Sequence, residues 1–146
     1  MQQYPHVYRV GAEADTGSAV QISSEGLSPL RSMPPKEFDG PGDLWSPESL
    51  LVAAVADCFI LTFRAIARAS QVNWLHLDCE ASGTLDRVDN VTCFTRFDIE
   101  AVLTVPAGTD DEKARRVLEK SEAVCLITNS LTAEKHLNIQ IRQAGA

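Results

Sequence analysis

The sequence predicts an α+β fold, and three features support that prediction. A long apolar segment at 47–69 begins with helix-start residues, two alternating segments at 74–86 and 91–105 follow it, and an amphipathic segment at 110–123 precedes a last alternating segment at 137–142. Strands and helices that follow one another in runs are typical of helices packed against an antiparallel sheet. With three short strands before the long helix, we expect the order βββ-α-ββ-α-β.

The N-terminal part predicts those three short strands and a loop. Residues 4–13 and 19–23 are rich in strand-forming or alternating side chains, and turn residues separate them. Residues 27–31 predict a third strand, which Pro29 restricts to a sheet edge. Residues 32–46 contain several prolines and glycines and predict a long loop, and such loops are often functional.

The long helix has clear start signals. Ser46 can cap the free amides, Pro47 suits the first helical position, and Glu48 lies at the positive end of the helix dipole. The run from 50 to 56 is apolar on every face, which predicts a central helix buried in a core or between subunits. Charged residues interrupt the helix at its start and along its second half, so we expect no membrane span. The charged positions are Glu48, Asp57, Arg64 and Arg68.

The two long alternating segments predict an antiparallel hairpin with one buried face. Cys79 and Cys93 have the inward parity of their strands, so we expect both to be packing residues. The run from Thr109 to Glu112 fits a capping box and predicts a helix that begins near Asp110.

Length and composition define the class of protein. A chain of 146 residues predicts one domain, 1–146, and its net charge of −7 argues against nucleic-acid binding. The first residues lack the basic and apolar regions of a signal peptide, so a cytoplasmic location is expected. The four cysteines include no Cys-x-x-Cys pair and the three histidines are scattered, so we expect no metal site.

Two segments of the sequence, each with one cysteine, resemble segments of one known protein family. The segment 46–59, SPESLLVAAVADCF, resembles the Asn-Pro-Glu-x-Leu…Ala-Ala-Cys-Phe helix of the OsmC/Ohr family (osmotically inducible protein C and organic hydroperoxide resistance proteins). The segment 119–131, which contains Cys125, is similar to that family's second cysteine segment. The Phe-Asp-Gly run at 38–40 is similar to the loop before the family's helix.

The resemblance implies an intertwined homodimer with active sites at the subunit interface. It implies a thiol-dependent peroxidase of oxidative stress defence that reduces organic hydroperoxides. Cys58 would be the redox-active, peroxidatic thiol, Cys125 would resolve it as a disulfide, and Glu48 would orient a catalytic arginine. A dithiol reductant would then recycle the enzyme, and no metal, haem or flavin cofactor is implied.

The expected cation must come from this chain's own residues. A thiol attacks peroxide as its thiolate, so a nearby positive charge is needed to favour that form. The stretch 11–18, where family members can hold the arginine, has none here, and Lys36 lies in the other family position. Arg31 is therefore the first candidate and Lys36 the second. The alternative is a catalytically silent OsmC-like dimer that binds a small apolar ligand.

Spacing adds a condition to this hypothesis. Glu48 and Cys58 would lie roughly 15 Å apart along one straight helix. If the family roles hold, either the helix breaks between them or Glu48 acts on the partner subunit's site. Trp45, Leu51, Val55, Phe59 and Phe63 could supply an apolar wall for an alkyl peroxide.

Overall fold

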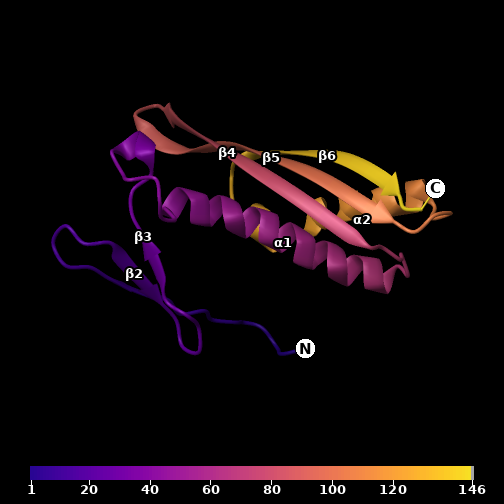
Figure 1. Cartoon of the computed structure of the whole chain (residues 1–146), viewed down its shortest axis with the longest axis horizontal. Coiled ribbons are helices and arrows are strands. Elements are labelled where there is room, and N and C mark those ends of the chain that lie inside the picture. Colours follow the sequence, from indigo (N-terminus) through magenta and orange to yellow (C-terminus); the bar gives the residue numbers. More distant parts are fainter. Residues whose placement is uncertain (146) are drawn as a thin grey trace. The chain divides into compact units, whose positions relative to one another are not determined.

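A computed structural model describes residues 1–145, and it confirms the α+β class and the order of elements. The chain divides into two compact units, Met1–Leu51 and Val52–Ala146, which are considered in turn (Figure 1). The first unit contains the strands β1 (Gly11–Glu13), β2 (Val20–Ser23) and β3 (Leu30–Ser32), the 3-10 turn η1 (Lys36–Phe38) and the start of helix α1 (Pro47–Ala69). The second contains the rest of α1, β4 (His76–Val88), β5 (Val91–Val105), α2 (Asp111–Val124), α3 (Leu126–Asn129) and β6 (Glu134–Gln143).

The first unit is built on a small antiparallel sheet of order β1-β2-β3. The predicted strand at 4–13 is wrong over most of its length, because β2 is only four residues long and pairs with β1 from Gly11 to Glu13. The third strand is an edge strand, as predicted, but it begins at Leu30 because residues 24–27 form a turn. The loop that follows returns to the sheet, where the amide of Met33 donates to the carbonyl of Trp45 at 2.9 Å.

Helix α1 begins and ends where the sequence predicts. The amide of Ser49 donates to Oγ of Ser46 at 3.1 Å, and the amide of Ser46 donates to Oγ of Ser49 at 2.9 Å, so the two residues cap the helix reciprocally. Its length and mean hydropathy of 2.1 would by themselves also suit a membrane. One stripe is nevertheless fully buried in the protein, and the other apolar positions are partly buried or exposed in the single chain. The stripe is Val55, Phe59, Phe63 and Ala67.

The second unit has a sheet of order β4-β5-β6, in which β4 and β5 form the predicted antiparallel hairpin. The prediction of an entirely antiparallel sheet is wrong, because β6 pairs with β5 in parallel. The connection 106–133 carries α2 and α3 and returns the chain to the end of the sheet where β5 began. A helical crossover of this kind is what a parallel pair requires.

A bulge in the hairpin overturns one expectation about the cysteines. Thr84 pairs with Arg96 while Leu85 pairs with Phe94, so Thr95 is an extra residue in β5. The bulge reverses which side chains face inward beyond that point. Phe94 therefore stacks on the buried Phe97, with ring centroids 5.3 Å apart. The prediction that Cys93 packs inside is wrong, since its side chain is exposed.

Close packing joins α1 to this sheet. A Cβ added to Gly83 of β4 would lie 2.9 Å from side-chain atoms of Val52, Phe94 and Phe97, so glycine allows the helix to approach. Helix α2 begins at Asp111 and is capped by Asp110, whose carboxylate accepts from the amides of Glu112 and Lys113. The cap predicted at Thr109 is therefore one residue early, because the Thr109 hydroxyl donates to the carbonyl of Pro106 instead.

Candidate functional site

Cys58 lies on the middle of α1 and is partly buried. Its sulfur is 3.7 Å from Oγ1 of Thr62, which follows one helical turn later. The local arrangement follows from the helix itself, because residues four apart lie on the same face. The thiol therefore has a hydroxyl neighbour on its own helix.

Cys125 lies between α2 and α3 and is only 1% exposed. Its extended backbone, with φ −62° and ψ 113°, ends the first helix and begins the second. Burial raises the pKa of the Cys125 thiol above its ordinary value, and hydrogen bonds from Thr128 oppose that rise. The Cys58 side chain raises the same pKa further, as a hydrogen-bonding neighbour and through its charge.

Cys79 of β4 is a third thiol in this region. Burial raises its pKa to about 11, and the charges of Asp78 and Cys125 act in the same direction. At neutral pH this residue therefore remains a protonated and weakly reactive thiol. It faces inward as predicted and is partly buried.

The chemistry open to this group of thiols follows from their mutual influence. The Cys58 side chain and the burial of Cys125 both raise the pKa of the Cys125 thiol. A thiol that lies close to an oxidised cysteine can capture its sulfenic acid as a disulfide, with loss of water. Within residues 1–145, no group of three His, Cys, Asp or Glu side chains is arranged to hold a metal ion.

Glu48 lies in the first turn of α1 and lines a pocket of about 430 Å³. Its Oε2 atom is buried and has no hydrogen-bond partner among residues 1–145. The other lining residues are mostly apolar and include no arginine or lysine. They are Val20, Ser32, Met33, Pro34, Pro35, Phe38 and Pro47. A buried carboxylate oxygen without a partner is costly, so this pocket is suited to receive a donor group.

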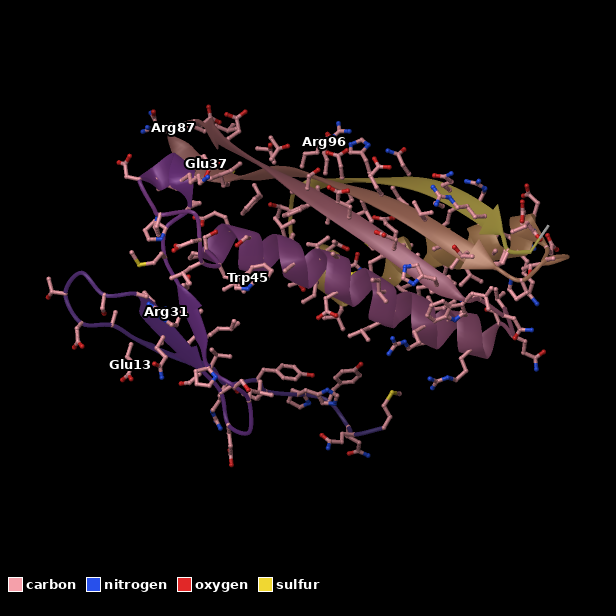
Figure 2. The ribbon with its side chains drawn as sticks, in the orientation of Figure 1. Glu13, Arg31, Glu37, Trp45, Arg87 and Arg96 are labelled. Carbon is pink, nitrogen blue, oxygen red and sulfur yellow. The ribbon has the colours of Figure 1, made fainter. Side chains whose placement is uncertain are left out.

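The structure does not bring the two candidate cations to that pocket. Arg31 pairs with Gln21 in the β2–β3 ladder, and its neighbour Ser32 lines the pocket, so the side chain of Arg31 projects from the other face of the sheet. Arg31 shares that face with Glu13, which lines a separate polar hollow with it (Figure 2). Lys36 is exposed and its aliphatic chain lies against Gly42.

Sequence reasoning missed two hydroxyl residues and overestimated the apolar wall. Thr62 follows Cys58 by four residues and Thr128 follows Cys125 by three, which are helical spacings that could have indicated both. Val55, Phe59 and Phe63 are fully buried and belong to the core, so these three side chains are not free to line an open site.

The fold and the thiols together define a class of protein: an α+β chain with two interacting cysteines, one on a long central helix and one between two later helices. The family model of OsmC-like proteins matches residues 40–140, and the chain belongs to that family.

Relatives and solved structures agree with this assignment. The chain is 28% identical over 109 residues to the uncharacterised protein YmaD of Bacillus subtilis, which covers 73% of each chain. It is 28% identical over 97 residues to peroxiredoxin OsmC of Escherichia coli, which covers 66% of this chain and 67% of that one. The fold matches an OsmC-like protein of Mycoplasma pneumoniae with a TM-score of 0.81 at 14% identity, over 95% of this chain and 99% of the other.

Proposed function

We propose that this protein is a thiol-dependent peroxidase that reduces organic hydroperoxides. The observation that carries the proposal is that Cys58 raises the pKa of the buried Cys125 thiol, although the two residues are 67 positions apart in the sequence. The relative named peroxiredoxin OsmC supports the reaction class. An organic hydroperoxide resistance protein of Legionella pneumophila, with a TM-score of 0.75 at 19% identity over 96% of this chain and 99% of that one, has the same fold.

The reaction has two steps and one regeneration. The Cys58 thiolate attacks the terminal oxygen of ROOH, the O–O bond breaks, and the alkoxide leaves and takes up a proton to give ROH, while Cys58 becomes a sulfenic acid. Cys125 then attacks that sulfur, a disulfide forms and water leaves. A dithiol reductant restores both thiols and is itself oxidised to a disulfide. Burial raises the pKa of Cys125, so its thiol has to lose a proton as it attacks the sulfenic acid of Cys58.

The proposed site also needs a cation and a carboxylate. Helix α1 is continuous from Pro47 to Ala69, so Glu48 cannot reach Cys58 through a break in the helix. We therefore assign Glu48 to the site of the partner subunit in a homodimer, where a donor from the other chain fills the pocket beside Oε2. Arg31 and Lys36 remain candidates for that donor across the interface.

The test is mass spectrometry of the reduced protein after one equivalent of cumene hydroperoxide. We expect a Cys58–Cys125 disulfide within seconds in the wild type and in Cys93→Ser, the matched control whose thiol is exposed and away from the site. Cys58→Ser should form no disulfide, and Cys125→Ser should stop at a sulfenic acid that dimedone traps. Free thiols that persist in the wild type would refute the enzymatic function.

The pocket beside Glu48 favours a second function, a silent dimer that binds a small apolar ligand. Its lining is largely apolar and holds one buried, unpartnered oxygen, which suits an apolar body with a single donor group. Titration with a long-chain aliphatic amine would test this. This function would be favoured over the first by two results together. The amine binds saturably to the wild type and not to Glu48→Met, and the thiols of the wild type do not react with peroxide.

A further inference from the structure

We propose that Lys135 is a positioning residue that holds Cys125 in place for disulfide formation. The proposal rests on the function proposed above and deepens it by naming what fixes the resolving thiol. Lys135 lies on β6, outside the segments that resemble the family's cysteine motifs. Its role would be mechanical, because it acts through the backbone on both sides of Cys125.

The ammonium group of Lys135 connects the two helices that flank Cys125. Nζ donates to Oδ1 of Asn129 at 3.0 Å, and it lies 3.4 Å from Oε1 of Glu122. Glu122 belongs to the last turn of α2 and Asn129 ends α3. One side chain from the sheet therefore bridges residues three before and four after the thiol.

Asn129 extends this bridge to the backbone. Its Nδ2 donates to the carbonyl of Ala123 at 3.2 Å, and its own amide donates to the carbonyl of Cys125 at 3.0 Å. By contrast, the amide of Cys125 reaches the carbonyl of Glu122 only at 3.4 Å, so the turn has a weak hydrogen bond at its centre. The side-chain bridge thus supplies constraint on the amide side of Cys125, where the backbone hydrogen bond is long.

Charge and anchoring both favour this role. The last turn of α2 has no basic residue of its own, so the cation beside its negative end comes from β6. The side chains of Lys135 and Glu122 are 23% and 22% exposed, which makes their pair less screened than one on an open surface. Lys135 also pairs in the ladder with Phe97, which is fully buried, so the base of the side chain is fixed.

The first experiment separates the two chemical steps in the variant Lys135→Met. We expect Cys58 to react with cumene hydroperoxide at the wild-type rate, the disulfide to form about tenfold more slowly, and the dimedone-trapped sulfenic acid to rise accordingly. Lys135→Arg should recover most of the rate, because it restores a cation with hydrogen-bond donors. Lys120→Met, which removes an exposed lysine of α2, should behave as the wild type. Equal resolution rates in Lys135→Met and the wild type would overturn the proposal.

A second measurement does not depend on peroxide at all. Reduced protein is equilibrated with oxidised and reduced dithiothreitol, and the ratio of Cys58–Cys125 disulfide to dithiol is measured. Lys135→Met should lower that ratio about tenfold, because a freer Cys125 meets Cys58 less often. If the wild type does not react with peroxide but the disulfide-to-dithiol ratio still falls in Lys135→Met, the proposed function fails and the positioning role stands. Should Lys135→Met fail to fold, Glu122→Gln removes the other charge of the bridge, and an unchanged ratio in that variant would overturn the role.

Discussion

The two units of the chain differ in whether they have a core of their own. Among residues 1–145, every buried apolar side chain lies at position 55 or later, and the buried residues of the first unit are only Ser32 and Ser46. The first unit instead exposes large apolar side chains. They are Met1, Tyr4, Val7, Tyr8, Val10, Leu27, Leu30, Phe38 and Trp45.

The difference extends to polar groups. In the second unit Cys58 raises the pKa of Cys125, and a threonine hydroxyl lies beside each of these thiols. The polar contacts of the candidate site are therefore made within that unit. In the first unit Glu48 has a buried carboxylate oxygen with no hydrogen-bond partner in the described part of the chain. A unit of this size that buries so little apolar surface is not expected to be stable alone. The comparison indicates that Met1–Leu51 needs another surface, which the homodimer proposed above would provide.

The largest expected effect comes from mixing two inactive variants. Glu48→Met should lower the rate of peroxide reduction about a hundredfold, because the cation loses the group that orients it. Cys58→Ser should be inactive. After joint refolding in equal amounts, about a quarter of the wild-type rate should return, since half the dimers are mixed and one of their two sites is intact.

A matched mixture provides the control. Cys58 and Cys125 interact within one chain, so mixing Cys58→Ser with Cys125→Ser should restore no turnover. Recovery in this mixture would contradict the pairing of Cys58 with Cys125 within one chain. No recovery in the first mixture would contradict the assignment of Glu48 to the partner's site. A wild type that sediments as a monomer at micromolar concentration would contradict the homodimer.

A smaller effect should distinguish the packing of the two units. Gly83→Ala adds a methyl group against Val52, Phe94 and Phe97, and we expect the free energy of unfolding to fall by about 1 to 3 kcal/mol. Gly11→Ala adds the same group where the nearest atom is Oγ of Ser23 at 3.7 Å, and a change within about 0.5 kcal/mol is expected. Urea unfolding of both variants gives the comparison. Equal losses would mean that the first unit is as tightly packed as the second.

Local features were predictable because short stretches of sequence determine them. The ends of α1 follow from the capping serine and the apolar run, and the interval 91–105 follows from alternation. The helical spacings that place Thr62 beside Cys58 are equally local. The fold class follows from such elements taken together, whereas the family was indicated by the resemblance of two cysteine segments.

Other features depend on parts of the chain that are distant in sequence. The bulge at Thr95 is set by pairing with β4, and it alone decides that Cys93 is exposed. The parallel direction of β6 is set by the crossover, which alternation cannot reveal. The proposed role of Lys135 depends on contacts among three elements, and the pocket beside Glu48 is lined by no arginine or lysine that could serve as the proposed donor.

The smallest expected effect concerns the pH dependence of stability in the second unit. The pKa of Cys79 is about 11 in the folded protein against an ordinary value of 9.0, chiefly because the thiol is buried. Between these values the unfolded chain releases the proton while the folded chain keeps it. The contribution of Cys79 to the free energy of unfolding is therefore fully present below pH 9 and is lost as the pH rises through 11.

Urea unfolding at several pH values checks that the free energy of unfolding falls as the pH rises. We expect the free energy of unfolding of the wild type to fall by about 1 kcal/mol more than that of Cys79→Ala between pH 8.5 and 10.5, a value reduced because the thiol is only partly buried. Cys93→Ala should keep the wild-type slope, since its side chain is exposed. If Cys79→Ala also keeps that slope, the thiol is solvated in the folded protein, and the contrast between a closed second unit and an open first unit is weaker than the packing indicates.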